Sequence, residues 1–192
     1  YARVAGVVEP IMVAELVEDA LRIQRPGYVN RGIEIVRQFE PTPPVLVDRH
    51  KVLQILVNLL ANARHAVEAA AAEPKQVALT ICAPDRHHVS ISIRDNGVGI
   101  APETLTRIFN HGFTTRKDGH GFGLHSGALA AREMGGALSA QSNGLGQGAT
   151  FTLVLPVAKE TTGAPVASGG VSRHPAGPDF TTSSQSATKE LP

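Results

Sequence analysis

Two asparagines four residues apart, Asn58 and Asn62, are the residues whose type and spacing first suggest chemistry. They lie in KVLQILVNLLANARHAV (51–67), which has the apolar period of an amphipathic helix. Positions four apart share one helix face, so both amides fall on a narrow polar stripe. A solvated face is the ordinary explanation, but such faces favour Glu, Lys and Arg. Amide oxygens also suit Mg²⁺ or a hydrogen-bonded ligand.

The first glycine-bearing stretch after this helix is RDNGVGI (94–100), which follows an expected strand. Gly97 and Gly99 would let the backbone turn tightly and approach a ligand. The carboxylate of Asp95, at the strand end, can accept two hydrogen bonds. An ordinary Asp-Asn-Gly turn is the alternative interpretation.

Two further stretches complete the set of candidate residues. FNHGFTTRKDG (109–119) is a polar loop long enough to be a lid, or a plain surface loop anchored by two phenylalanines. GHGFGLHSGALAA (119–131) places alternating glycines before a predicted helix, where outward backbone amides and the helix dipole favour an anion. It lacks both the Gly-Lys-Ser/Thr of a P-loop and the βαβ context of a dinucleotide fingerprint.

Taken in order, these stretches resemble the catalytic ATP-binding domain of bacterial sensor histidine kinases. That domain belongs to the superfamily shared with DNA gyrase, the heat-shock chaperone ATPases and the mismatch-repair ATPases. NLLANA resembles the family's N box, DNGVGI its G1 box, FNHGFTT its F box and GHGFGLH its G2 box, while GQGATFTLVLP resembles its closing hairpin. The resemblance covers residues 9–157. It implies a two-layer α/β sandwich, the Bergerat ATP-binding fold, with a mixed sheet packed on helices and ATP under a mobile lid.

The resemblance also implies roles for individual residues. Asp95 would hydrogen-bond the adenine amino group, with Thr150 behind it, while Asn58 and Asn62 would face the phosphates and Mg²⁺. Lys117, in the lid, would assist at the γ-phosphate. The residues expected around ATP are Asn58, Asn62, His65, Asp95, Gly97, Gly99, Ile100, Phe109, Phe113, Thr114, Thr115, Gly119, His120, Gly121, Phe122, Gly123, Leu124 and Thr150.

Two histidines depart from the most frequent family pattern. His65 stands where many members carry Lys or Arg toward the phosphates, and a partly protonated imidazole would replace that charge near neutral pH. His120 lies inside the G2 glycines, where we expect its ring to point outward to solvent.

The residue at position 58 bears on the reaction. Hydrolases of the superfamily carry a glutamate there that activates water, and an asparagine cannot act as a base. We therefore expect transfer of the γ-phosphoryl group to a histidine of a separate dimerisation domain, with a response regulator receiver domain as the next partner. None of the eight histidines of the chain stands in the family's acceptor context. The alternatives are a non-catalytic nucleotide-binding or interaction module, an ATP hydrolase, and an anti-sigma-type serine kinase.

The composition sets the remaining expectations. The chain has 192 residues with net charge +1, 42% hydrophobic and 18% charged residues, which gives no reason to expect nucleic acid or membrane contact. The single cysteine, Cys82, excludes an internal disulfide and is expected as a buried strand thiol. With no signal peptide and no apolar run that could span a bilayer, we expect a cytoplasmic domain. Because the chain starts at Tyr1, we expect it to come from a longer protein, which an upstream segment can anchor to a membrane.

Local patterns predict the elements that position these residues. We expect a strand running into a helix over 9–24, a strand at 33–40, and Asp48 as N-cap of the asparagine helix, which ends near Ala72. A hairpin over 76–96, a short helix over 102–109, a helix over 123–136 and a second hairpin over 137–156 follow. The Ser-, Thr-, Pro- and Gly-rich residues 158–192 are expected to be a disordered tail after one domain, 1–157.

Overall fold

The computed structural model describes residues 7–114 and 121–158, and the account below is confined to them. The elements in chain order are β1 (Val8–Ile11), α1 (Val13–Val29), β2 (Glu34–Phe39), β3 (Val45–Asp48), α2 (Arg49–Glu68), β4 (Gln76–Asp85), β5 (His88–Asp95), α3 (Pro102–Leu105), α4 (Gly123–Glu133), β6 (Ala137–Gln141) and β7 (Ala149–Pro156). Residues 159–192 lie outside the described part, so the boundary at residue 157 stays a prediction.

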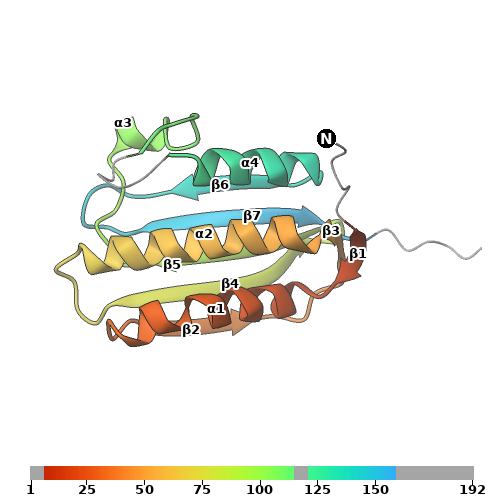
Figure 1. Ribbon diagram of the computed structural model, residues 1–192, viewed down its shortest axis with the longest axis horizontal. Helices are drawn as coiled ribbons and strands as arrows, with labels where there is room; N and C mark the ends of the chain where they lie inside the picture. Colours follow the sequence, from red (N-terminus) through yellow and green to blue (C-terminus); the bar gives the residue numbers. More distant parts are fainter. Residues whose placement is uncertain (1–6, 115–120, 159–192) are drawn as a thin grey trace, which may run out of the picture. The chain divides into compact units, whose positions relative to one another are not determined.

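Five strands form the main sheet in the order β2-β4-β5-β7-β6. Strand β2 runs parallel to β4, and all other neighbours are antiparallel, so the sheet is mixed. Helices α1, α2 and α4 lie side by side over one face of this sheet (Figure 1), while β1 and β3 make a separate antiparallel pair. The expected two-layer α/β sandwich is confirmed.

The core lies between the two layers and follows from strand alternation. Alternate residues along the middle of the central strands face the helices and are buried, as with Val77, Leu79 and Ile81 of β4. Cys82 has the opposite parity, so it lies on the face without helices and is only partly buried. The prediction of a buried thiol was therefore wrong.

Helix α2 is the central element of the helical layer. As predicted, Asp48 caps it, because its carboxylate accepts hydrogen bonds from the N–H groups of His50 at 3.0 Å and Lys51 at 3.3 Å. The helix ends at Glu68, four residues before the expected end. The carbonyl of Ala66 accepts from the N–H of Val98 at 3.1 Å, so the loop after β5 occupies the end of the helix.

Two other helices differ from the predicted bounds. Helix α1 continues through Pro26 to Val29, because Tyr28 is buried and its hydroxyl donates to the carbonyl of Leu60 at 2.7 Å. The predicted helix at 102–109 is a single turn, Pro102–Leu105, followed by turns. Helix α4 begins at Gly123 as predicted and ends at Glu133, before Gly135 in a left-handed conformation with φ of +76°.

Candidate functional site

A cavity of about 720 Å³ lies between α2, the segment after β5 and the N-terminus of α4. Its size is that of a pocket for a drug-sized or nucleotide-sized ligand. It is lined by many of the residues that the sequence singled out. Those residues are Asn58, Asn62, His65, Asp95, Gly99, Ile100, Phe113, Thr114, Gly121, Phe122, Gly123 and Leu124.

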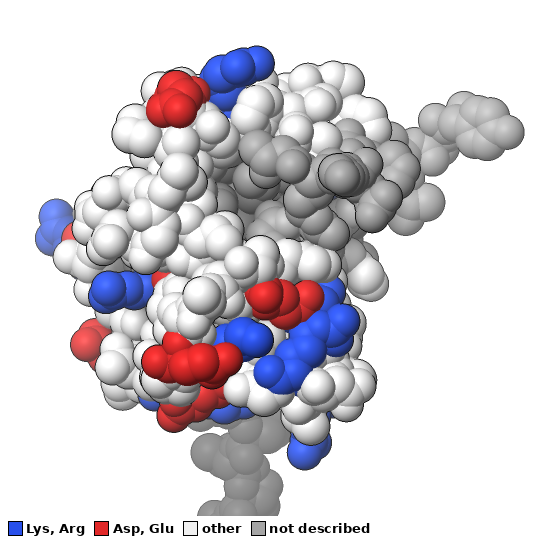
Figure 2. Space-filling view, turned by 90° about the vertical axis from the view of Figure 1, so that its left-hand side faces the viewer, with Lys and Arg blue, Asp and Glu red and all other residues white. Residues whose placement is uncertain are grey.

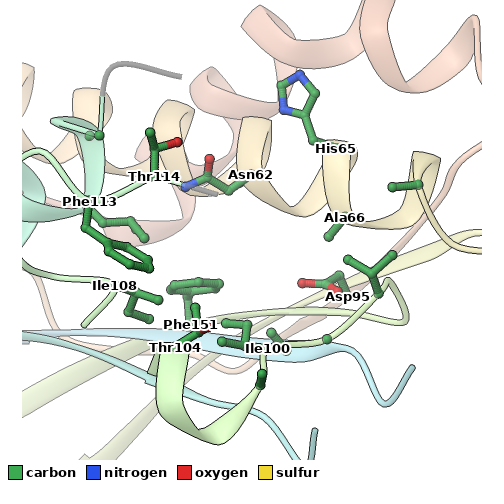
Figure 3. A pocket seen from close by; sticks show the side chains of 18 of the residues that line it. Asn62, His65, Ala66, Asp95, Ile100, Thr104, Ile108, Phe113, Thr114 and Phe151 are labelled. Carbon is green, nitrogen blue, oxygen red and sulfur yellow. The ribbon is translucent and has the colours of Figure 1, made fainter. Parts of the chain in front are cut away.

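One end of the cavity is built around Asp95, the last residue of β5 (Figure 3). The residue is 3% exposed, and its Oδ1 accepts a hydrogen bond from the N–H of Gly97 at 2.9 Å. Burial raises the pKa of Asp95 above its ordinary value, and backbone hydrogen bonds with Gly97 and Ala149 oppose part of that rise. The cavity therefore ends in a buried acceptor that a donor group on a ligand would satisfy.

The glycines next to Asp95 are required by close packing. A Cβ added to Gly97 would lie 2.6 Å from the carbonyl oxygen of Ala66, so the loop after β5 can lie against α2 only with glycine there. Gly99 has φ of +70° and lies against the carbonyl of Gly144. Gly97 packs against the backbone of α2 and is not part of the cavity lining, whereas Gly99 lines the cavity.

The two asparagines lie along the middle of the cavity, on the face of α2 turned toward it. Figure 3 shows the side chain of Asn62 directed into the space between Asp95 and Thr114. The amide of Asn58 lies against Gly123, and a Cβ added to this glycine would be 2.6 Å from Nδ2. No side chain caps α4, so the first backbone N–H groups of the helix begin at this part of the cavity.

His65 occupies the rim of the cavity. Figure 3 shows its ring on the α2 side and turned away from Asp95. Its Nε2 lies 3.2 Å from Nη2 of Arg64, the residue before it.

Besides Gly97, two further predicted residues do not line the cavity. Thr150 pairs with Arg94 across the strands and does not line the cavity. Its neighbour Ala149 pairs with Asp95 and faces the cavity, so the sequence expectation was displaced by one residue on an alternating strand. Phe109 packs against the core, and its carbonyl accepts a hydrogen bond from Nδ1 of His125 at 2.9 Å.

Four predicted residues, Thr115, Lys117, Gly119 and His120, lie outside the described residues. Just before them, Phe113 lines the cavity and carries the guanidinium of Arg107 5.1 Å from its ring centre. The last described residues before this stretch therefore lie at the cavity.

The structure also brings together residues that the sequence did not single out. These residues are Ala66, Ala69, Val98, Ala101, Thr104, Ile108, Leu145, Ala149 and Phe151. Thr104 and Ile108 stand four apart, and Ala149 and Phe151 two apart, so the periods of helix and strand carried a signal for them. Ala66 follows Asn62 by four residues on α2 and so shares its helix face, and the others are small or apolar residues with no such pattern.

Residues 7–114 and 121–158 hold no group of three or more His, Cys, Asp and Glu that could bind a metal. A cation in the cavity would depend on amide oxygens and on oxygens of a ligand. None of the described helices is long and apolar enough to cross a membrane.

Comparison with known proteins identifies the family. Residues 47–159, more than half of the chain, match the model of the histidine kinase-, DNA gyrase B- and HSP90-like ATPases. The chain therefore belongs to this family. Within it, the chain is homologous to the catalytic domains of sensor histidine kinases, as the following relatives indicate.

The sensor protein FixL of Bradyrhizobium diazoefficiens is 32% identical over 149 residues, which cover 77% of this chain and 29% of FixL. Full-length ShkA, solved in complex with AMPPNP, has a TM-score of 0.68 and 32% identity over 81% of this chain and 32% of ShkA. The catalytic domain of histidine kinase ThkA, at 23% identity, shares the fold with a TM-score of 0.67 over 78% of this chain and 95% of that domain. The chain thus spans less than a third of FixL and of ShkA.

Proposed function

We propose that this chain is the ATP-binding catalytic domain of a sensor histidine kinase, which binds Mg-ATP and donates the γ-phosphoryl group. The observation that carries the proposal is the placement of one buried carboxylate, Asp95, at one end of a cavity whose middle is lined by Asn58 and Asn62. A purine with an exocyclic amino group would satisfy Asp95, and the phosphates would then extend toward α4. The ATP analogue bound to the related ShkA supports the choice of ligand.

The proposed adenine end combines one charge with apolar walls. Ala66, Ile100 and Phe151 surround the space in front of Asp95 (Figure 3). A flat base buries its faces against such walls, while the carboxylate reads the amino group at its edge. Guanine presents a carbonyl oxygen where adenine has the amino group, and that oxygen would meet a carboxylate without a proton to share.

The middle of the cavity fits Mg²⁺ bound with phosphate. Mg²⁺ usually takes only one or two protein oxygens and completes its shell with water and phosphate oxygens. We assign Asn62, directed into the cavity, and Asn58, beside Gly123, as the residues that would hold it. When bound, the ion would neutralise negative charge on the phosphates. The backbone N–H groups at the start of α4 would add a second source of positive potential.

Phosphotransfer is favoured over hydrolysis by the chemistry of position 58. The Asn58 amide cannot take a proton from water, and the described lining offers Asp95 as its only carboxylate. Asp95 lies at the adenine end, so it cannot act as that base. The chain's own residues would position ATP, and the nucleophile would be a histidine of the dimerisation domain of the same kinase. A response regulator receiver domain would accept the phosphoryl group next, and the reaction would take place in the cytoplasm.

Calorimetry on the 192-residue chain tests this proposal. We expect ADP and a non-hydrolysable ATP analogue to bind with micromolar dissociation constants, with Mg²⁺ strengthening only binding that involves phosphates. GTP should bind at least about a hundredfold more weakly, because the buried carboxylate of Asp95 would face the carbonyl oxygen of guanine, and both groups are hydrogen-bond acceptors. Equal binding of ATP and GTP would remove the role of Asp95. Absence of any nucleotide binding would favour an interaction module instead.

A turnover assay separates kinase from hydrolase. The chain alone with Mg-ATP should release phosphate no faster than the buffer control, since no base lies at position 58. Sustained hydrolysis that disappears in Asp95→Asn would instead assign the chain to the hydrolases of the family.

A further inference from the structure

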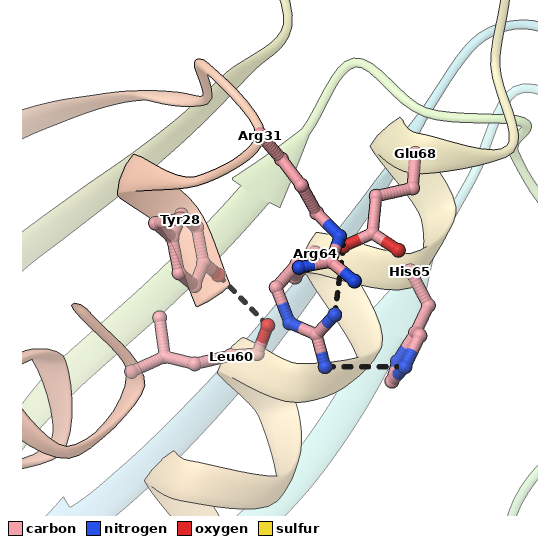
Figure 4. Close-up of polar contacts among 6 residues, drawn as sticks. All are labelled: Tyr28, Arg31, Leu60, Arg64, His65 and Glu68. Carbon is pink, nitrogen blue, oxygen red and sulfur yellow. Dashed lines mark hydrogen bonds and ion pairs between the residues drawn. The ribbon is translucent and has the colours of Figure 1, made fainter. Parts of the chain in front are cut away.

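Beside the cavity, the C-terminal part of α2 carries polar side chains to which the proposed function gives no role (Figure 4). We call three of them, Arg64, His65 and Glu68, together with Arg31 from the turn after α1, the α2 polar cluster. Arg64 Nη1 donates to Glu68 Oε1 at 2.7 Å, and Arg31 Nε pairs with the same oxygen at 2.5 Å. Arg64 Nη2 reaches the ring of His65, with 3.2 Å between Nη2 and Nε2. One arginine thus bridges an ion pair and a residue of the cavity rim.

The position of Arg64 is restricted from several sides. Its side chain is only 16% exposed, and it passes over Gly27 of α1, where an added Cβ would lie 2.9 Å from Cδ of Arg64. The hydrogen bond from Tyr28 to Leu60 holds α1 against α2 at this level. Arg64 therefore lies in a slot between two helices, closed by Glu68.

Charges of both signs meet at this end of the molecule. The face at the C-terminal ends of α1 and α2 shows acidic and basic side chains next to one another (Figure 2). Burial alone would raise the pKa of Glu68, but the hydrogen bond and charge of Arg64, followed by the charge of Arg31 and by that of His65 when its ring is protonated, outweigh it and lower that pKa. Glu68 is thus held as a carboxylate that keeps Arg64 in place.

The contact between Arg64 and His65 favours one protonation state of the ring. A guanidinium group has only donors and stays charged, so Nη2 must donate and Nε2 must accept. The imidazole is then neutral, with its proton on Nδ1. An imidazolium would place an N–H group against another N–H group, and the contact would be lost.

We propose that Arg64 is a positioning residue for the nucleotide site: it holds His65 on the cavity rim as the neutral Nδ1–H tautomer. The proposal rests on the proposed function, because it assigns what position 65 presents to a nucleotide. That position offers an uncharged, oriented ring instead of a cation. This assignment differs from the sequence expectation of a partly protonated His65.

The first test reads the ring itself and needs no nucleotide. ¹⁵N spectra of the histidine rings are recorded on the 192-residue chain at neutral pH, and His65→Gln identifies the His65 signals by their loss. We expect a protonated Nδ1 and a bare Nε2 in the wild type. In Arg64→Met, which keeps the length but not the donors, the proton should redistribute toward Nε2. A protonated Nε2 in the wild type would overturn the proposal, whatever the chain binds.

The second test couples the ring to the ligand. Arg64→Met should weaken ADP binding about three- to tenfold, which is the value of one hydrogen bond. The same change in a His65→Ala background should cause no further loss, because Arg64 acts through His65. If Arg64→Met weakened ADP binding equally in both backgrounds, Arg64 would not act through His65. Arg37→Met is the matched control, since it removes an exposed ion pair between Arg37 of β2 and Glu18 of α1 and should change neither reading.

Glu68→Gln provides a milder variant for the case in which Arg64→Met does not fold. It keeps the size of the side chain but weakens the hold on Arg64. We expect a mixture of His65 tautomers and a smaller loss of ADP affinity. A fixed Nδ1–H ring in this variant would show that Glu68 is dispensable and would contradict the bridging arrangement. If no nucleotide binds to any form while the tautomer follows the expectation, the proposed function fails and the role of Arg64 at a nucleotide site fails with it, while its hold on the His65 ring is retained.

Discussion

The two ends of the cavity are built differently. At the Asp95 end, a strand terminus, a buried carboxylate and the loop through Gly97 are held by backbone hydrogen bonds and by packing against α2. At the opposite end, exposed or half-buried groups such as Thr114, Phe122 and Gly123 belong to segments that flank residues 115–120.

This difference indicates that the two ends of the cavity contribute differently to ligand binding. A rigid end with one buried acceptor can discriminate between chemical groups, because an unsatisfied buried carboxylate is costly. An open end with several weak donors gains affinity from charge and can exchange its occupant. We therefore expect variants at the Asp95 end to abolish binding, and variants toward α4 to change mainly the response to phosphates and Mg²⁺.

The largest effect is expected for Asp95→Asn. The substitution replaces an acceptor-only group with an amide that also presents donors, so we expect about a hundredfold loss of ADP affinity. Titration calorimetry of the wild type and the variant measures it. A loss of less than about threefold would mean that the two ends do not differ as described.

The same variant should be more stable than the wild type at neutral pH. Because burial raises the pKa of Asp95, the folded state binds a proton more readily than the unfolded state. Stability is then fully present below the unfolded-state pKa of an aspartate and is lost as pH rises through the higher folded-state pKa. Asp95→Asn removes that loss, so urea unfolding should show a gain at pH 7 that shrinks in acid. A less stable variant at pH 7 would contradict the desolvation of Asp95.

A smaller effect is expected for Gly123→Ala at the other end. The added methyl group would overlap the amide of Asn58, so either this amide or the start of α4 must move. We expect about a tenfold loss for the triphosphate analogue with Mg²⁺ and less for ADP without it. Gly127→Ala, on the same helix, is the matched control, because its added Cβ has its nearest neighbour, Leu138, at 3.4 Å. Equal losses in both variants would point to a general effect on α4.

Asn62→Ala should act through the ion alone. Removing the amide oxygen should leave ADP binding without Mg²⁺ within about twofold and abolish most of the Mg²⁺-dependent gain. Parallel titrations with and without Mg²⁺ measure both numbers. If Asn62→Ala weakened binding equally in both conditions, Asn62 would contact the nucleotide and not the ion.

The smallest effect is expected for Thr150→Val. This variant tests which residues of β7 face the cavity. Thr150 lies on the face of the sheet away from the cavity, so its hydroxyl should contribute nothing and ADP affinity should stay within about twofold. Ala149→Val, one residue earlier, places two methyl groups toward Asp95 and should weaken binding clearly. A reversed order of the two variants would restore the original assignment of Thr150.

Elements with strong local signals were predictable from the sequence. Asp48 as a cap, the period of α2 and the alternation of β4, β5 and β7 each follow from contacts within a few residues. Helix ends were less predictable, because a distant segment decides them. Val98 takes the Ala66 carbonyl and ends α2 early, and Tyr28 draws α1 beyond Pro26.

The residues of the site divide in the same way. Four residues could be recognised in the sequence because the local structure alone does not favour their types. These are Asn58, Asn62, Asp95 and Gly99, and all four line the cavity. Ala66, Leu145 and Ala149 could not be found in this way, because an alanine or a leucine carries no chemical signal until other elements surround it.

By itself, the sequence determined the polar stripe of α2, the glycines that accompany Asp95, and the order of the boxes that led to the family. Residue type and chain period are local properties, and they suffice for such features. Only the tertiary structure decided that Ala149, not Thr150, faces Asp95, and that Arg64 reaches the ring of His65. Both depend on strand pairing and on the packing of α1 against α2, and these bring together residues that are distant along the chain.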